Sequence, residues 1–453
     1  MSETFQEPSA EELEAFFQYL RIPSVSARAH HASDVRACAE WLNTLLRGWG
    51  LDSRVHETGG APLVVAKSTV QPGKKTILLY GHYDVQPVEP LDYWTSPPFE
   101  PCVRDGFVYA RGATDNKGQT FSHLIGLHRS LKQGALPVNV TILLEGEEEI
   151  GSPNLGKFLR ENRDLFACDA VLISDTSMIE PGWPALTLGL RGVACFDVNV
   201  FGPRADLHSG IFGGPTPNPA MVLCKVLAEL QDTGGRITIP GFYENVVAPS
   251  DAEIAAWKEL PWDESWFEKT TGIAPSGGET AYSVLERAWS RPTVEINGLT
   301  SGHQGDGSKT IIPSTASAKI SFRLVPGQDP DDLAPGIIKW FQRKLSEHGV
   351  AGSALYDHGG LPFYCAPDHP VLSAARDSLQ RIFGRQPALI REGLSIPVTS
   401  LFAEILAVPV ILAGLGLPDC QAHAPNESYP AAHLELGAEF LQDFLRTLAG
   451  EKG

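Results

Sequence analysis

The stretch Thr76-Ile-Leu-Leu-Tyr-Gly-His-Tyr-Asp84 joins a short apolar run to a histidine and a carboxylate two residues apart. Residues 76–80 have the continuous apolar character of a strand that is buried on both faces of a sheet. Side chains alternate along an extended chain, so His82 and Asp84 lie on the same side. This pair suits a metal ligand with a carboxylate partner for its second ring nitrogen. The alternative is a strand-end histidine that is simply hydrogen-bonded.

Similar apolar runs predict three more strands, at residues 63–66, 138–144 and 170–174. Helical patterns, from about 116–132 and from 152–163, separate several of these strands. Buried strands interleaved with helices favour a largely parallel α/β sheet. The length of 453 residues exceeds the usual size of a single domain, so we expect at least two domains.

The pattern changes after about residue 188 and returns to the α/β type from about residue 366. Between these points we expect strands at 192–201, 293–297, 316–325 and near Ala354, and helices at 219–230 and 331–347. Two helices against one small, mostly antiparallel sheet form an α+β layer domain. We therefore predict a discontinuous α/β domain, residues 1–187 and 363–453, with a smaller α+β domain inserted at 188–362.

Acidic side chains follow two other strand-like segments. Asp115 comes after residues 107–114 and directly before a helix, so an ordinary helix N-cap is the alternative to a functional role. A second set, Glu145, Glu147, Glu148 and Glu149, follows the apolar strand that ends near Leu144. A charge run is usually a solvated face, but like charges beside a buried strand repel one another unless a cation neutralises them.

Asp175 ends the strand at 170–174, and His423 lies in a loop after a predicted strand at 408–412. The carboxyl ends of parallel strands line one edge of a sheet, where such folds bind ligands. Five candidate metal ligands should meet there: His82, Asp115, Glu149, Asp175 and His423. Mixed histidine and carboxylate ligation favours Zn²⁺, with Mn²⁺ or Co²⁺ as the alternatives in a more oxygen-rich site.

The overall composition excludes several classes of protein. Thirty-six Lys and Arg against 54 Asp and Glu give a net charge of -18, which disfavours nucleic acid and anionic membranes as partners. The longest uncharged apolar stretch, residues 407–418, is too short for a membrane span. The seven cysteines are widely spaced and show no metal or disulfide motif. Because residues 1–7 lack the character of a secretory signal, we expect a cytoplasmic protein.

Several motifs together resemble those of the co-catalytic metallopeptidases, which include carnosinases, cytosolic non-specific dipeptidases, glutamate carboxypeptidase, aminoacylases and a desuccinylase of lysine biosynthesis. They are Gly81-His-Tyr-Asp-Val, Gly112-Ala-Thr-Asp-Asn-Lys-Gly, Glu145-Gly-Glu-Glu-Glu-Ile-Gly-Ser, Ile173-Ser-Asp, Asp206-Leu-His-Ser-Gly, Phe322-Arg-Leu-Val-Pro and Ala422-His423. The resemblance covers nearly the whole chain. Leu188-Gly-Leu-Arg-Gly and Leu207-His-Ser-Gly-Ile-Phe-Gly-Gly look most like the dipeptidase and carnosinase branch.

The resemblance implies a zinc-peptidase-like catalytic domain that binds two divalent metal ions per chain. Asp115 would bridge the ions, His82 and Asp175 would complete one site, and Glu149 and His423 would complete the other. Glu148 would be the general base, and Asp84 would orient His82. A cis peptide bond between Asp115 and Asn116 is also implied.

In the inserted domain, the resemblance implies a lid and dimerisation role. Arg323 would clamp a substrate carboxylate, for which its planar fork is suited. Further positions match substrate contacts: Thr310, just upstream of the Arg323 strand, His358, Glu392 and Ser395. Glu392 would suit a free α-amino group. His208 would reach the active site of the partner subunit in a homodimer and stabilise the oxyanion there.

We therefore predict a cytoplasmic dinuclear metallodipeptidase that cleaves dipeptides or short peptides with metal-activated water and Glu148. One alternative is the same chemistry on another amide, as an N-acyl amino acid deacylase, a desuccinylase or a carboxypeptidase. The other is a catalytically silent metal-binding homologue, which would have lost Glu148 or a metal ligand. This chain retains Glu148 and all five candidate metal ligands.

Overall fold

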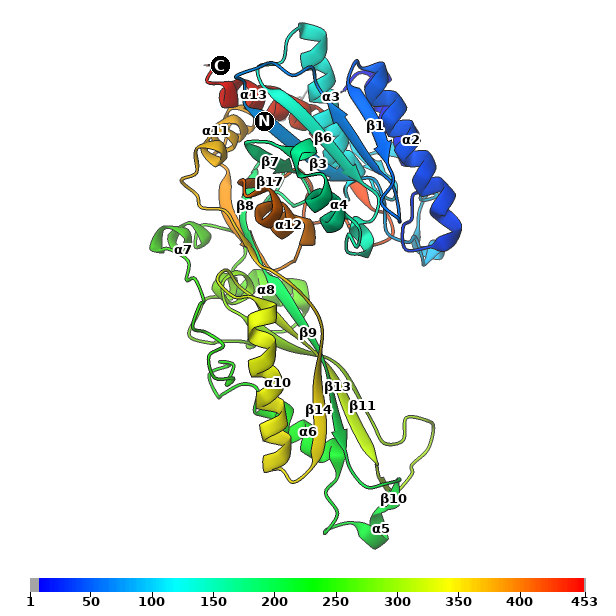
Figure 1. Cartoon of the computed structure of the whole chain (residues 1–453), viewed down its shortest axis with the longest axis vertical. Coiled ribbons are helices and arrows are strands. Elements are labelled where there is room, and N and C mark those ends of the chain that lie inside the picture. Colours follow the sequence, from blue (N-terminus) through cyan, green and yellow to red (C-terminus); the bar gives the residue numbers. More distant parts are fainter. Residues whose placement is uncertain (1–7, 452–453) are drawn as a thin grey trace. The chain divides into compact units, whose positions relative to one another are not determined.

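The computed structural model describes residues 8–451, which form two compact units (Figure 1). Of the described residues, unit 1 comprises 8–188, 365–390 and 397–451, and unit 2 comprises Gly189–Tyr364 and Arg391–Ile396. The sequence had placed residues 391–396 in the second α/β part. They group with unit 2 because Arg391 forms a buried ion pair with Glu253 at 2.8 Å and Arg191 Nε donates to the Gly393 carbonyl at 3.1 Å.

The main sheet has the order β1-β2-β6-β3-β7-β17-β8-β15, with β16 pairing to β8. Its strands are β1 (Asp52–His56), β2 (Leu63–Lys67), β3 (Thr76–His82), β6 (Asn139–Glu145), β7 (Ala170–Ile173), β8 (Ala185–Leu190), β15 (Phe363–Tyr364), β16 (Ala388–Glu392) and β17 (Val410–Gly414). Most of this sheet belongs to unit 1, while β15 and the last two residues of β8 and of β16 fall in unit 2. The four central strands, β6, β3, β7 and β17, are parallel. The predicted α/β fold with a mostly parallel central sheet is confirmed. The carboxyl ends of these four strands lie at one edge.

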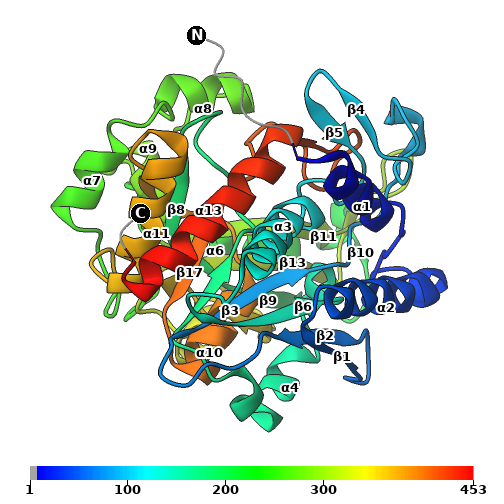
Figure 2. The same cartoon turned by 90° about the horizontal axis from the view of Figure 1, so that it is seen from above.

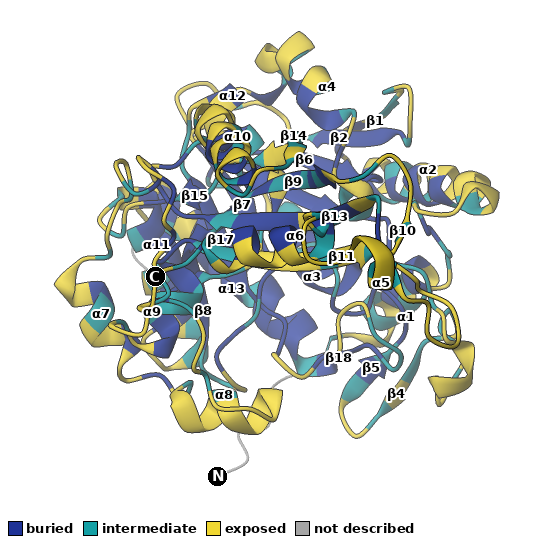
Figure 3. Ribbon diagram, turned by 90° about the horizontal axis from the view of Figure 1, so that it is seen from below, coloured by how far each residue is buried: buried dark blue, intermediate teal, exposed yellow. Residues whose placement is uncertain are grey.

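Helices cover both faces of this sheet. Those of unit 1 are α1 (Ala10–Leu20), α2 (Ala32–Gly48), α3 (Lys117–Gln133), α4 (Leu155–Glu161), α11 (Pro370–Phe383), α12 (Pro397–Leu406) and α13 (Ala431–Ala449). Figures 2 and 3 show α3 and α13 on one face, and Figure 3 shows α4 and α12 on the other. A capping box of Ser9 and Glu12 starts α1, and Gly50 adopts a left-handed conformation after α2, with φ of 88°.

A small second sheet of unit 1 has the order β18-β5-β4, with β4 (Cys102–Arg104), β5 (Phe107–Tyr109) and β18 (Ser428–Pro430). The sequence predicted a longer strand-like segment, 107–114, that would carry Asp115 to the edge of the main sheet. Instead, β5 ends at Tyr109, and the chain turns through Gly112, whose φ is 84°. Asp115 is therefore supplied by the loop before α3.

Unit 2 contains a four-stranded antiparallel sheet with the order β11-β13-β9-β14. The strands are β9 (Gly192–Phe201), β11 (Thr293–Ser301), β13 (Thr315–Leu324) and β14 (Ala351–Gly360), and a two-stranded sheet joins β10 (Leu207–His208) to β12 (Ile311–Ile312). The helices α6 (Pro219–Ala228) and α10 (Pro330–Glu347) pack on the four-stranded sheet around a core that includes Phe196, Phe322 and Trp340. This is the α+β layer arrangement that the sequence predicts.

Four short helices of unit 2 were not predicted from the sequence: α5 (Ser209–Phe212), α7 (Asp251–Trp257), α8 (Glu264–Thr271) and α9 (Val284–Trp289). Capping boxes start two of them, with Ser250 and Glu253 at α7 and Ser283 and Glu286 at α9. Such short segments give little helical periodicity in the sequence, and their caps are the clearest local signal.

Across residues 8–451, the helices are all too short or too polar to cross a lipid bilayer. Residues 1–7, on which the expectation of a cytoplasmic protein partly rested, lie outside the described residues.

The packing of α3 against α13 predicts a stability effect at Gly126. A Cβ atom at this position would lie 2.4 Å from the backbone carbonyl oxygen of Ala438. We expect Gly126→Ala to lower the free energy of unfolding by about 1–3 kcal/mol, because the two helices must separate. Gly48→Ala is the control, since no atom lies within 4 Å of its Cβ position. Chemical denaturation checks this, and a Gly126→Ala protein as stable as Gly48→Ala would contradict the packing.

Candidate metal centre

Five side chains that the sequence singled out gather into two groups that could each hold a metal ion. In the first group, His82 Nε2 lies 3.2 Å from Asp115 Oδ1 and 3.6 Å from Asp175 Oδ2. In the second, His423 Nε2 lies 2.8 Å from Asp115 Oδ2 and 3.4 Å from Glu149 Oε2. Asp115 belongs to both groups, and it turns one carboxylate oxygen toward each histidine.

The edge of the central sheet positions most of these groups. His82 ends β3, and Asp175 follows β7, the neighbouring parallel strand. Glu149 lies in the short 3-10 helix η3 (Glu148–Ile150), which follows β6 on the other side of β3. His423 lies in the loop after β17 and has a positive φ of 63°. Adjacent strand ends thus bring together residues that are far apart in the chain.

Asp115 reaches the site from the start of α3. The N-cap of that helix is Asn116, which makes no side-chain cap hydrogen bond, so the N-cap interpretation of Asp115 is wrong. The peptide bond between Asp115 and Asn116 is cis, as the family resemblance implied. The side chain of Asp115 is consequently free of a helix-capping role and faces both histidines.

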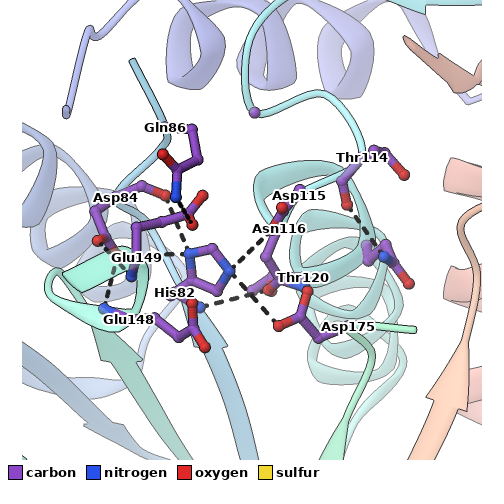
Figure 4. Close-up of polar contacts among 12 residues, drawn as sticks. His82, Asp84, Gln86, Thr114, Asp115, Asn116, Thr120, Glu148, Glu149 and Asp175 are labelled. Carbon is purple, nitrogen blue, oxygen red and sulfur yellow. Dashed lines mark hydrogen bonds and ion pairs between the residues drawn. The ribbon is translucent and has the colours of Figure 1, made fainter. Parts of the chain in front are cut away.

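Asp84 lies beside His82 and contacts it directly (Figure 4). His82 Nδ1 lies 3.0 Å from the backbone carbonyl oxygen of Asp84 and 3.4 Å from Asp84 Oδ1. The Asp84 carboxylate also accepts hydrogen bonds from the backbone amides of Glu148 and Glu149, at 3.2 and 3.1 Å. The residue predicted to orient His82 therefore contacts it mainly through its backbone, while its carboxylate holds the turn that carries the two glutamates.

The acidic run after β6 divides into two kinds of residue. Glu145 accepts a hydrogen bond from the Tyr80 hydroxyl at 2.7 Å, and its burial raises its pKa to about 8. Glu147 accepts hydrogen bonds from the backbone amide of Ala61 and the side chain of Asn154. These hydrogen bonds connect Glu145 and Glu147 to neighbouring segments, and neither residue belongs to a candidate metal group. Glu149 belongs to the second group, and the neighbouring Glu148 belongs to neither.

Two polar residues support the carboxylates and were not predicted from the sequence (Figure 4). Gln86 Nε2 donates to Glu149 Oε2 at 2.7 Å, and Asn116 Nδ2 donates to Asp175 Oδ1 at 2.8 Å. Gln86 continues the alternation of His82 and Asp84, so this spacing could have identified it. Asn116 follows no such alternation, so no sequence periodicity identifies it.

The carboxylates of the site lie close together and are unfavourable without added positive charge. Burial raises the pKa of Glu148 well above its usual range, and burial also raises the pKa of Glu149 and Asp175. Hydrogen bonds to Asp115 and then Glu149 raise the pKa of His423 to about 10. These shifts mean that the protein alone draws protons into the site to offset its carboxylates. Divalent cations would supply that charge and leave both histidines neutral as ligands.

Two of the candidate ligand atoms also lack a hydrogen-bond partner among the described residues, which leaves them available to bind a metal ion. Within residues 8–451, His82 Nε2 and Glu149 Oε1 are buried and make no hydrogen bond. Such orphaned atoms are unusual in a protein interior and need a partner. Imidazole nitrogen and carboxylate oxygen are the donors that Zn²⁺ and related divalent ions accept. The donor set therefore fits two such ions, one in each group.

Unit 2 carries the remaining predicted residues. Arg323 Nη1 on β13 donates to Ser395 Oγ at 3.2 Å, so these two candidate substrate contacts lie together, with Glu392 three residues before Ser395. His358 on β14 is exposed and lies 2.9 Å from the Asp357 carboxylate. His208 is exposed at the end of β10, where its Nδ1 accepts from the Gly210 amide. Thr310 is adjacent, because its carbonyl accepts from the Ser209 amide.

The shared position of Asp115 predicts how substitutions change metal content. Asp115→Ala should weaken both sites, whereas Asp175→Ala should leave the group of Asp115, Glu149 and His423 intact. We expect the first variant to fall furthest below two ions per chain in elemental analysis after dialysis. Glu404→Ala, an exposed residue that contacts Arg160, is the control. Two tightly bound ions in Asp115→Ala would remove this residue from the shared position.

Comparison with known proteins agrees with this geometry. A family model described as Peptidase family M20/M25/M40 matches residues 78–447. The Cys-Gly metallodipeptidase dug1 of Schizosaccharomyces pombe is 32% identical over 446 residues, which cover 94% of this chain and 93% of the relative. The Beta-Ala-His dipeptidase of Homo sapiens is 32% identical over 372 residues, which cover 81% of this chain and 73% of the relative.

A solved structure extends the agreement to the fold. The M20 family metallo-carboxypeptidase Sso-CP2 from Sulfolobus solfataricus has a TM-score of 0.84 and 31% sequence identity to this chain, with 97% of this chain and all of the other covered. The resemblance to co-catalytic metallopeptidases, and to their dipeptidase and carnosinase branch, is confirmed. The chain belongs to Peptidase family M20/M25/M40.

Proposed function

We propose that this protein hydrolyses the peptide bond of dipeptides or short peptides with two divalent metal ions held by unit 1. Membership of the family and the two metallodipeptidase and dipeptidase relatives support metal-dependent dipeptide hydrolysis. The observation that carries the proposal is the Asp115 carboxylate, which faces His82 with one oxygen and His423 with the other. A carboxylate shared in this way suits a pair of ions that act together.

In this proposal, His82 and Asp175 hold one ion, Glu149 and His423 hold the other, and Asp115 holds both. When bound, the ions lower the pKa of a water molecule and polarise the peptide carbonyl. We favour Zn²⁺, with Mn²⁺ or Co²⁺ as alternatives, because the ligands combine two imidazoles with three carboxylates.

Glu148 is the proposed general base. Its backbone is fixed by the hydrogen bond to Asp84, and it directly precedes the ligand Glu149. Burial raises the pKa of Glu148, which makes its carboxylate a stronger proton acceptor. It would take a proton from the attacking water and deliver it to the amine nitrogen as the carbon–nitrogen bond breaks.

Unit 2 would be the lid and dimerisation domain, and it would supply residues that bind the ends of the substrate. Arg323 and Ser395, which are hydrogen-bonded to each other, would hold the substrate carboxylate. Glu392 would bind a free α-amino group, and His358 and Thr310 would make further contacts. A site that recognises both charged ends of a substrate favours short peptides over acylated amino acids.

We also propose a homodimer formed through unit 2. Strand β11 is at an edge of its sheet and exposes Ile296 and Leu299, with 47% and 54% of their surface accessible. The helix α5 begins directly after His208 and is exposed (Figure 3). Its apolar side chains Ile211 and Phe212 are also exposed. Exposed apolar side chains on an edge strand suit association with a second copy.

We also propose that the protein is located in the cytoplasm. Its seven cysteines form no disulfide bonds, which suits a reducing compartment.

A substrate screen tests the proposed activity. Metal-loaded protein would be given dipeptides, N-acyl amino acids, N-succinyl-diaminopimelate and peptides with a blocked amino terminus, in the presence of Zn²⁺, Mn²⁺ or Co²⁺. We expect unblocked dipeptides to be cleaved fastest. Preferred cleavage of blocked peptides would favour a carboxypeptidase, which is the activity named for the Sulfolobus structure. No cleavage of any amide would indicate a catalytically silent homologue.

The control for that screen is Glu148→Gln. This variant should keep two metal ions and its fold, and lose about 10²- to 10⁴-fold in turnover, because proton transfer is the lost function. Turnover within a few-fold of the wild-type rate would show that Glu148 is not the base.

A mixing experiment tests whether His208 acts on the partner subunit. His208→Ala and Glu148→Ala chains should each be inactive alone, and their mixture should regain activity. In a heterodimer, one active site holds both native residues if His208 is supplied in trans. Isotope or tag labelling would verify that subunits exchange. No recovery after verified exchange, or full activity of a stable monomer, would contradict the assignment.

A further inference from the structure

Glu427 is a buried carboxylate, 0% exposed, four residues after His423. Each of its oxygens accepts two hydrogen bonds. Oε2 accepts from Arg111 Nη1 at 2.7 Å and from the Gly112 amide at 2.9 Å. Oε1 accepts from the Thr114 amide at 2.8 Å and from the Asp115 amide at 2.9 Å. One side chain therefore binds four donors that all belong to the loop carrying Asp115.

The loop that carries Asp115 has backbone acceptors for some of its amides, since the Arg111 amide donates to the Pro98 carbonyl at 2.8 Å and the Ala113 amide to the Ala110 carbonyl at 3.2 Å. It lies between the end of β5 at Tyr109 and the start of α3 at Lys117. Its other amides must find acceptors elsewhere, because a buried unpaired N–H group costs about 1–3 kcal/mol. The Glu427 carboxylate supplies acceptors for three of them, from a position more than 300 residues away in the chain.

The backbone around Glu427 makes the same connection. The Glu427 carbonyl oxygen accepts from the Ala110 amide at 3.2 Å, and Ser428, the next residue, pairs with Tyr109 in the small sheet. The segment that carries His423 is thus tied to the segment that carries Asp115 by both side chain and backbone. His423 Nε2 and Asp115 Oδ2 lie 2.8 Å apart and belong to the same candidate metal group.

We propose that Glu427 is a positioning residue that holds the Asp115 carboxylate in its shared orientation between the two metal groups. The inference rests on the proposed function only in taking Asp115 as a ligand of both ions. The Glu427 side chain contacts no candidate metal-ligating atom and acts through the backbone amides of Gly112, Thr114 and Asp115. Its loss would let the loop shift and would weaken both sites together, because both use Asp115.

The charge balance at Glu427 makes a conservative substitution informative. Arg111 is 1% exposed, and besides Glu427 it donates to the Pro87 carbonyl at 3.1 Å. Glu427→Gln keeps the size of the side chain but replaces one acceptor oxygen with an NH₂ group, which cannot accept from the loop amides. It also leaves the Arg111 charge without its carboxylate.

The test is the metal affinity of Glu427→Gln, measured by competition with a chromophoric chelator for Zn²⁺. We expect the apparent affinity to fall about 10- to 100-fold, the range seen when residues that orient metal ligands are replaced. Glu435→Gln is the matched control. Glu435 is also buried and binds an arginine, Arg129, at 2.5 and 2.8 Å, but it lies on α13 away from the loop. This variant should keep the wild-type affinity.

An affinity of Glu427→Gln within about three-fold of wild type, at equal metal stoichiometry, would overturn the proposal, as would an equal loss in Glu435→Gln. If Glu427→Gln does not fold, hydrogen exchange of the wild-type protein decides. The amides of residues 112, 114 and 115 should exchange slowly, and rapid exchange there would overturn the proposal. Neither readout uses hydrolysis, so a protein that binds two ions but cleaves no peptide would contradict the proposed function alone.

Discussion

The structure of unit 1 is organised around the sharing of one carboxylate, Asp115, by two histidine-containing groups. Three carboxylates and two imidazoles in a largely buried place are unfavourable without added positive charge. The raised pKa values of Glu149, Asp175 and His423 express that need in the metal-free protein. Two divalent ions would supply the missing positive charge, and the surrounding hydrogen bonds hold the ligand side chains in place.

Much of this arrangement could be predicted from the sequence because it depends on strand ends. Apolar runs locate β3, β6 and β7, and the parallel sheet aligns their carboxyl ends, so His82, Glu149 and Asp175 could be placed together. Asp115 was predicted as a site residue but assigned to the wrong element. Its position depends on a turn at Gly112 and on a loop held by Glu427, and neither produces a periodic pattern.

The supporting contacts were harder to predict because they join distant segments through single side chains. Gln86 could have been found by alternation, whereas the side chains of Asn116 and Glu427 bind residues far away in the chain and follow no periodic pattern. In unit 2, the antiparallel sheet and its two helices follow from periodicity, but the short helices α7 to α9 do not. The segment at 391–396 was assigned to the α/β domain because the α/β pattern resumes near residue 366, but its contacts with Glu253, Arg191 and Arg323 place it in unit 2.

We propose that the chain uses two metal ions, joined through Asp115, to hydrolyse dipeptides. Titration of metal-free protein with Zn²⁺, with dipeptide hydrolysis and bound metal followed together, tests this proposal. Activity should reach its maximum only as the second equivalent per chain binds. Full activity at one equivalent, or activity that persists in excess chelator with no metal bound, would contradict it.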